Sequence, residues 1–193
     1  GDKRKNYSWQ DTYDFINLVS NELRKLISKG DRCLLISENR PEWFISDLSI
    51  MLSGSITVPA YTTYADRDYE YIINDCTPSV IIVSNNQQFN KIKSICMTNS
   101  SIKKIISFED LNGVEGNKYF HIKNLIEKDV KLEEIKLKIK AARSDPACII
   151  YTSGTQGNPK GVILSHGGIL NNCDGALDIL KPLLSDQTRF LTW

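Results

Sequence analysis

The chain has 193 residues, and its 24 basic and 23 acidic side chains nearly cancel to a formal net charge of +1. This balance excludes a strong field toward nucleic acid or an anionic membrane surface. No apolar run approaches the roughly 18 residues that a membrane-spanning helix requires, and no signal peptide is visible. We therefore expect a globular, cytoplasmic protein with no transmembrane segment and no nucleic-acid partner; the sequence leaves peripheral membrane association and oligomeric state open.

Apolar periodicity predicts helices and short strands that alternate along the chain. Residues 11–29 carry apolar side chains three and four positions apart, which predicts an amphipathic helix that ends at Gly30. Pro41 suits the first position of a second helix, with Asn39 as its cap and Trp43 in the core. Further helices are predicted at 66–75 and 87–94, and strands at 33–36, 56–58, 80–83 and 103–106. This alternation indicates an α/β fold with a doubly wound, mainly parallel sheet and flanking helices.

Two later segments are less regular. Residues 113–125 are predicted to form a surface loop. Residues 131–140 fit both strand alternation and helical spacing, and the pairing of Glu134 with Lys138 favours a helix. Because Glu133 and Glu134 interrupt the lysines of this segment, a solvated helix face is favoured over a nucleic-acid patch.

The five cysteines are odd in number and include no C-x-x-C pair. Four of them lie in or beside apolar runs, so buried free thiols in a reducing compartment are favoured over disulfides or zinc ligands. The cysteines are Cys33, Cys76, Cys96, Cys148 and Cys173.

The most informative chemistry lies in residues 151–162, which read Y-T-S-G-T-Q-G-N-P-K-G-V. Apolar runs at 147–150 and 162–164 flank this glycine-rich segment, so it is predicted to be a loop between two short strands. Backbone N–H groups exposed by glycines form an anion-binding concavity, and Lys160 adds a positive charge. An ordinary polar turn uses similar residue types but gives no role to this lysine. The segment therefore predicts a polyphosphate-binding loop.

The spacing of the loop excludes two common nucleotide-binding motifs. A P-loop reads G-x-x-x-x-G-K-[ST] and leads into a helix, whereas Lys160 stands between Pro159 and Gly161 and leads into a predicted strand. A dinucleotide fingerprint, G-x-G-x-x-G at the start of a helix, is absent.

Residues 151–162 instead resemble the phosphate-loop signature of the adenylate-forming (AMP-binding) superfamily, [YF]-T-S-G-[ST]-T-G-x-P-K-G-[VT], with Gln156 at the one departure. Other segments, in the expected order, are most similar to the N-terminal part of a long-chain fatty acid–CoA ligase (acyl-CoA synthetase). The matching segments are residues 30–36, 39–43, 58–63, 71–75 and 165–169, the last of which departs from its pattern at Gly168.

The resemblance implies roles for the polar residues of the loop. The Thr152 hydroxyl would contact Mg²⁺, and Thr152 and Lys160 would assist catalysis by stabilising charge on the leaving pyrophosphate. Gln156 can still donate from its amide, so altered loop geometry is expected rather than loss of binding. The residues expected to bind ATP are Thr152, Ser153, Gly154, Thr155, Gln156, Gly157 and Lys160. His166, at the start of a predicted helix, is interpreted as a cap or packing residue.

The implied activity is ligation of a fatty acid to coenzyme A, with ATP and Mg²⁺, through an acyl-adenylate. Family members are far longer, so residues 1–193 are expected to be a partial N-terminal AMP-binding domain with its phosphate loop at 151–162. The remainder of the large domain and the small C-terminal domain would be absent, and the fragment alone is expected to be inactive. Two alternatives stay open: an adenylation domain that loads a carrier-protein thiol, and a nucleotide-binding module without catalysis.

Overall fold

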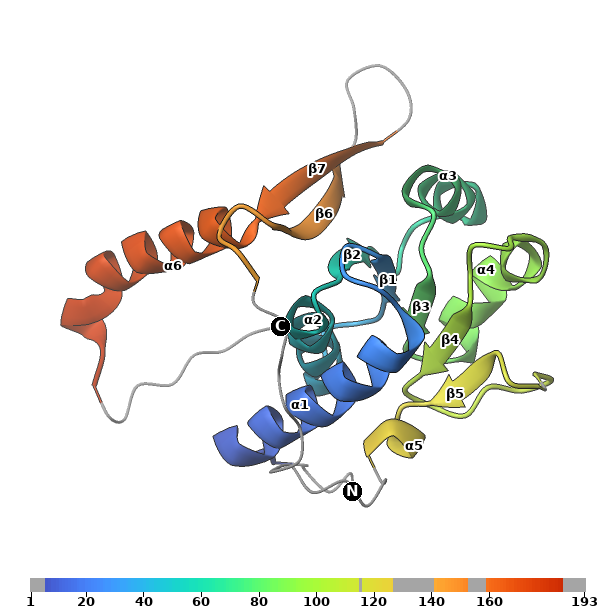
Figure 1. Ribbon diagram of the computed structural model, residues 1–193, viewed down its shortest axis with the longest axis horizontal. Coiled ribbons are helices and arrows are strands. Elements are labelled where there is room, and N and C mark those ends of the chain that lie inside the picture. The colour runs from blue at the N-terminus through green and yellow to red at the C-terminus, as the bar shows by residue number, and fades with distance from the viewer. Residues whose placement is uncertain (1–5, 115, 127–140, 153–158, 186–193) are drawn as a thin grey trace.

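The computed structural model describes residues 6–114, 116–126, 141–152 and 159–185 (Figure 1). Its centre is a seven-stranded sheet with the strand order β5-β4-β3-β1-β2-β6-β7. Neighbouring strands run parallel, except that β6 and β7 form an antiparallel pair. The strands are β1 (Arg32–Ile36), β2 (Ile56–Ala60), β3 (Val80–Val83), β4 (Lys104–Ser107), β5 (Tyr119–His121), β6 (Pro146–Thr152) and β7 (Lys160–Ser165). The predicted mainly parallel sheet is confirmed.

Helices cover both faces of the sheet, as a doubly wound fold requires. Helices α1 and α2 pack on one face and α3 and α4 on the other, while α6 extends away from the sheet (Figure 1). The helices are α1 (Trp9–Leu26), α2 (Pro41–Ser53), α3 (Asp66–Cys76), α4 (Asn86–Thr98), α5 (Lys123–Ile126), α6 (His166–Leu180) and the short 3-10 helix η2 (Lys181–Leu183). Among the described residues, no helix is both long enough and apolar enough to cross a membrane.

Two hydrophobic cores sandwich the parallel strands, because successive strand residues point to opposite faces. In β1, Leu34 and Ile36 belong to the core under α3 and α4. Cys33 and Leu35 of the same strand belong to the core under α1 and α2. This explains why β1 reads as an unbroken apolar run in the sequence.

The ends of α1 and α2 differ from the predictions. Helix α1 begins after Ser8, which forms a capping box with Asp11, and it ends at Leu26 rather than at residue 29. Its cap, Ile27, is extended and buried in the core, so the apolar pattern continues past the helix end. Gly30 instead adopts φ +84° in the turn before β1, where its N–H donates to Gly54 O at 2.9 Å.

In α2, Pro41 occupies the first helical turn as predicted. The expectation that Asn39 caps this helix is wrong, because the capping position is Arg40, whose side chain makes no capping hydrogen bond. Arg40 instead forms ion pairs with Glu42 and Glu109, both at 2.9 Å. Trp43 is half-buried and packs against the core between α1 and the sheet.

The predicted surface loop at 113–125 is also partly wrong. Residues 119–121 form β5, which pairs in parallel with β4, and α5 begins at Lys123. Tyr119 packs against one core and Phe120 against the other, so this short edge strand alternates like the others. The segment 131–140, predicted as a helix, lies outside the described residues.

The predicted burial of the thiols is confirmed at four positions. Cys33, Cys76, Cys96 and Cys148 are free and buried. Cys173 is free and exposed on α6.

Candidate phosphate-binding site

The β6–β7 hairpin holds the two described ends of the predicted phosphate loop. Thr152 is the last residue of β6, Lys160 is the first residue of β7, and the two are directly paired across the hairpin. Both side chains are exposed. Directly opposite residues of an antiparallel pair lie about 4.5–5.5 Å apart at Cα, so a hydroxyl and an ammonium group flank the same loop. The predicted strand–loop–strand context is therefore confirmed, but both strands extend further than predicted, so Thr152 and Lys160 lie in β6 and β7 rather than within the loop.

The central residues of the loop lie outside the described residues. The ATP-binding roles of these residues therefore stay predictions. They are Ser153, Gly154, Thr155, Gln156 and Gly157.

Tyr151, the residue before Thr152, is only 3% exposed and anchors the base of the hairpin. Its hydroxyl donates a hydrogen bond to Asp75 Oδ2 at the end of α3. Burial, followed by this hydrogen bond, raises the pKa of Tyr151 well above its usual range, so the phenol stays a donor at physiological pH. The Tyr64 hydroxyl donates to the Tyr151 backbone carbonyl oxygen at 3.4 Å.

A cavity of about 500 Å³ opens beside this base, at the carboxyl ends of β1, β2 and β6. Ligands of open α/β sheets characteristically bind at the carboxyl ends of the strands. Glu38 lines the cavity and accepts hydrogen bonds from Gln88 Nε2 at 3.1 Å and Asn85 Nδ2 at 3.4 Å. Burial alone would raise the pKa of Glu38, but its hydrogen bonds outweigh burial and lower it. The cavity therefore offers an ionised acceptor, which suits a hydroxyl or ammonium group better than a phosphate.

Few of the described side chains near the loop have the oxygen donors that Mg²⁺ prefers. The described residues contain no group of three His, Cys, Asp or Glu side chains placed to hold a metal ion. Mg²⁺ usually keeps several waters and binds through substrate phosphates plus one or two protein oxygens. The exposed hydroxyl of Thr152 has the chemistry of one such protein oxygen.

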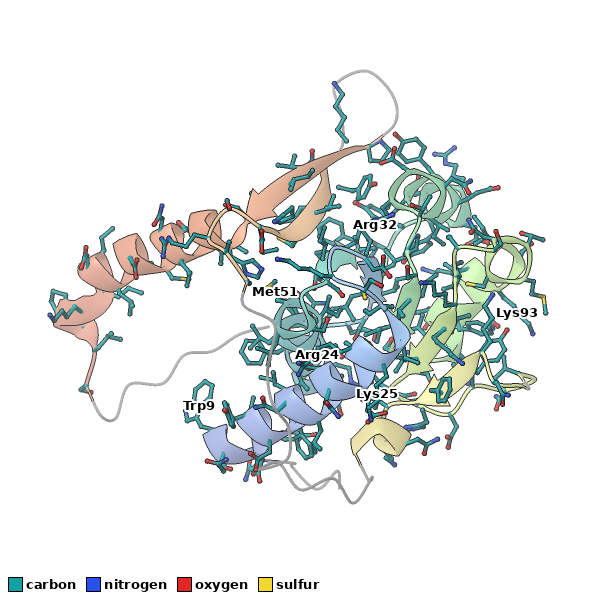
Figure 2. All side chains as sticks on the ribbon, viewed as in Figure 1. Trp9, Arg24, Lys25, Arg32, Met51 and Lys93 are labelled. Carbon is teal, nitrogen blue, oxygen red and sulfur yellow. The ribbon has the colours of Figure 1, made fainter. Side chains whose placement is uncertain are left out.

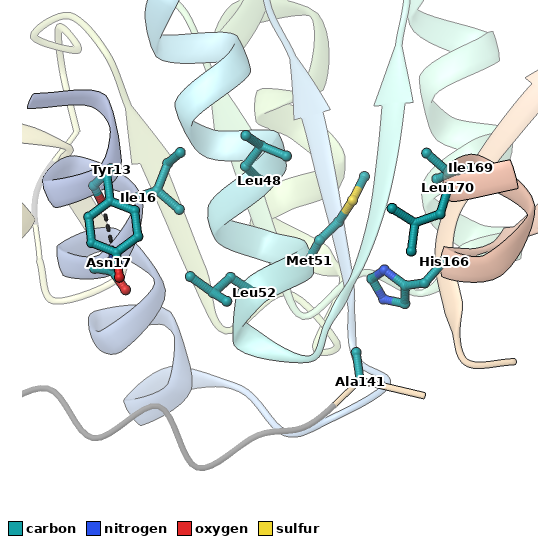
Figure 3. A pocket seen from close by; sticks show the side chains of 10 residues that line it. All are labelled: Tyr13, Ile16, Asn17, Leu48, Met51, Leu52, Ala141, His166, Ile169 and Leu170. Carbon is teal, nitrogen blue, oxygen red and sulfur yellow. Dashed lines mark hydrogen bonds between the residues drawn. The ribbon is translucent and has the colours of Figure 1, made fainter. Parts of the chain in front are cut away.

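His166 lies at the opposite end of β7 from Lys160. A six-residue strand spans about 20 Å, so this imidazole cannot act on a group held at the loop. The cap of α6 is Ser165, whose Oγ accepts from the Gly168 N–H at 3.1 Å. The His166 ring borders an apolar cleft of about 470 Å³ between α1, α2 and α6, facing Met51 (Figure 3).

Sequence reasoning did not predict the contacts of Asp75 and Tyr64 with the base of the hairpin. Asp75 and Tyr151 are 76 positions apart, so no local spacing connects them. The only signal was indirect: residues 71–75 belong to a segment that resembles the fatty-acyl branch of the superfamily.

The chain is similar to known proteins of one family. The family model described as AMP-binding enzyme matches residues 2–193. A long-chain-fatty-acid–CoA ligase of Rattus norvegicus is 30% identical over 172 residues, which cover 87% of this chain and 24% of that protein. Long chain acyl-CoA synthetase 3 of Arabidopsis thaliana is 31% identical over 196 residues, which cover 96% of this chain and 29% of that protein.

A crystal structure of an anthranilate CoA ligase in complex with anthranoyl-AMP also matches. It superposes with a TM-score of 0.68 at 26% identity and covers 84% of this chain and 30% of that one. The chain therefore spans about a quarter of the length of the curated relatives it matches.

Proposed function

Because the chain belongs to the AMP-binding enzyme family, we propose that it is the N-terminal part of the nucleotide-binding domain of an ATP-dependent fatty acid–CoA ligase. The observation that carries this proposal is the β6–β7 hairpin, which sets the Thr152 hydroxyl opposite the Lys160 ammonium group at the two ends of the predicted phosphate loop. We propose a long-chain acid as the substrate because the curated relatives are named long-chain ligases.

In the proposed reaction, a carboxylate oxygen attacks the α-phosphorus of ATP and pyrophosphate leaves. The thiol sulfur of coenzyme A then attacks the acyl carbonyl, its proton is released to water, and AMP leaves. A carboxylate is repelled by the triphosphate, so the protein contributes mainly positioning and charge neutralisation. Lys160 would stabilise the charge that builds on the leaving pyrophosphate. Thr152 would orient its hydroxyl toward Mg²⁺, which would neutralise phosphate charge when bound.

The chain spans only about a quarter of its curated relatives. We therefore propose that residues 1–193 bind Mg-ATP through the loop but do not complete the ligase reaction alone. Coenzyme A and the fatty acid would be substrates of the complete protein.

The proposal is tested by carboxylate-dependent exchange between ATP and pyrophosphate, measured on the complete protein with a panel of short- to long-chain acids. We expect exchange to peak with long-chain acids. Lys160→Ala should lower it by about 10²–10³-fold, the usual cost of removing a group that stabilises transition-state charge. Lys93→Ala, a lysine on α4, serves as the matched control and should leave exchange unchanged.

Two outcomes would contradict the proposal in different ways. Exchange that requires an amino acid would favour loading of a carrier-protein thiol. An absence of exchange with every acid, despite Mg-ATP binding, would favour a nucleotide-binding module without catalysis.

A further inference from the structure

The residue at the base of the phosphate loop, Tyr151, is held from several sides. Its hydroxyl donates to Asp75 Oδ2, and its backbone carbonyl accepts from Tyr64. On the facing strand, a Cβ built on Gly161 would come within 3.2 Å of Tyr151 Cζ, so the ring lies directly against the backbone next to Lys160. The Tyr151 side chain, which belongs to β6, thus also contacts β7, and these two strands flank the loop.

Asp75 lies at the end of α3 that is hydrogen-bonded to the sheet. Asp75 is in the last turn of α3, beside Cys76, and the buried face of that helix is part of the core. Arg32 of β1, labelled in Figure 2, ties the end of α3 to the sheet. Its Nε donates to Cys76 O at 2.7 Å, and its Nη2 donates to Thr77 Oγ1 at 2.6 Å. The Asp75 backbone therefore has little freedom to move relative to the sheet.

Hydrogen bonds and ring contacts also fix the turn that carries Tyr64. Tyr69, which is fully buried, donates its hydroxyl to Tyr61 O at 2.6 Å. Lys91 Nζ donates to Thr62 O at 2.5 Å. The Tyr64 ring meets the Tyr61 and Tyr69 rings edge-on, with centroids 5.4 and 6.0 Å apart. Aromatic pairs in this geometry add stability beyond the area they bury, so the turn that carries Tyr64 is fixed to α3 and α4.

We propose that Asp75 and Tyr64 are positioning residues for the phosphate loop, acting through Tyr151. Successive strand residues point to opposite faces, so holding the Tyr151 side chain sets the direction of the Thr152 hydroxyl. The contact of the same ring with Gly161 carries this constraint across to Lys160. The network thus orients the two groups that would bind the polyphosphate, although neither Asp75 nor Tyr64 touches it. This inference rests on the proposed function of the loop.

The experiment is a calorimetric titration of the chain with Mg-ATP, with urea unfolding of each variant in parallel. Tyr151→Phe keeps the ring but loses the donor, and Asp75→Ala loses the acceptor. We expect each variant to weaken Mg-ATP binding by about 5- to 10-fold, because binding must then orient a loop that the hydrogen bond no longer holds, at a cost no larger than that of one charge-assisted, partly exposed hydrogen bond. The double variant should bind no more weakly than either single variant, because both remove the same interaction.

Two controls separate positioning from a general structural role. Asp75→Asn keeps an acceptor oxygen and should restore binding, while Tyr13→Phe, an exposed tyrosine on α1, should bind as the wild type does. Losses in binding that simply add in the double variant, or that Asp75→Asn does not reverse, would overturn the positioning role.

Lys160→Ala distinguishes failure of this inference from failure of the proposed function. If Lys160→Ala weakens binding while Tyr151→Phe and Asp75→Ala do not, positioning is wrong and the loop assignment stands. If the wild type does not bind Mg-ATP, or if Lys160→Ala does not change its affinity, the assignment of the phosphate loop is wrong. The positioning role of Asp75 and Tyr64 is then wrong as well.

Discussion

Gly161 lies directly against Tyr151, its partner on the facing strand of the β6–β7 hairpin. A Cβ at Gly161 would stand 2.8 Å from Ile149 Cγ2 and 3.2 Å from Tyr151 Cζ. The sequence pattern suggests that the loop glycines expose N–H groups to an anion. This last glycine instead sits within β7, where close packing against two side chains excludes a larger residue.

We therefore predict that Gly161→Ala destabilises the chain by about 1–3 kcal/mol, the usual cost of forcing an extra methyl group into a packed site. Urea unfolding measures this difference. Gly175→Ala is the matched control, because nothing lies within 4 Å of a Cβ built there on α6. That substitution should stabilise slightly, since alanine favours helix over glycine.

Gly161→Ala should cost less stability in an Ile149→Ala background than in the wild type, because Ile149→Ala removes the methyl group that the new Cβ meets. Equal stability of Gly161→Ala and the wild type would show that the hairpin tolerates a side chain there. It would also contradict the inference that close packing requires a glycine at position 161.

Asp47 of α2 provides a pH-dependent prediction. Burial raises the pKa of its carboxyl above the usual 3.8, and a hydrogen bond from Thr57 opposes this only in part. The folded state therefore favours the protonated form, and this contribution to stability is fully present below pH 3.8 and lost as the pH rises through the raised folded-state pKa.

Asp47→Asn should consequently be more stable than the wild type at pH 7, and the advantage should disappear below about pH 4. Urea unfolding between pH 3 and 8 checks this, with Asp174→Asn on exposed α6 as the control. An advantage that is independent of pH would show that burial of the ionised carboxylate is not the cause.

The thiols give a third prediction. Burial raises the pKa of both Cys76 and Cys96 to about 12, and Cys33 and Cys148 are also buried. The thiolate is the reactive form. At pH 8 we therefore expect an aromatic disulfide reagent to label one thiol of the folded chain rapidly, and all five after unfolding.

Cys173→Ser should abolish the rapid phase, because Cys173 is the one exposed thiol among the described residues. Rapid labelling of two or more thiols in the folded wild type would contradict the burial of the other four.

Much of the fold follows from local pattern. Fully buried strands such as Val80–Val83 appear as short apolar runs, and Pro41 marks the start of α2 because its fixed φ suits the first turn. The strand order does not follow from local pattern, because it depends on which strands meet in space. Edge strand β5 was missed for the same reason: three residues become a strand only through pairing with β4.

Local pattern likewise predicts some features of the candidate site, whereas others depend on tertiary packing. Residue types and spacing predicted the strand–loop–strand context but placed Thr152 and Lys160 within the loop, whereas the structure places them in the flanking strands. The contact between Asp75 and Tyr151 joins positions that are 76 residues apart, so it exists only after α3 and β6 have packed. Residue spacing does not predict the packing role of Gly161, because spacing cannot show what lies against a backbone.

A calorimetric titration of the wild type, Lys160→Ala and Lys93→Ala with Mg-ATP tests most directly whether residues 151–162 bind a polyphosphate. The Lys160 ammonium group is exposed, so its removal should weaken binding by about 10-fold, at the lower end of the range for a charge-assisted contact. Lys93→Ala should match the wild type, since this lysine lies on α4, apart from the hairpin (Figure 2). Equal affinities for all three proteins would contradict the assignment of residues 151–162 as a phosphate-binding loop.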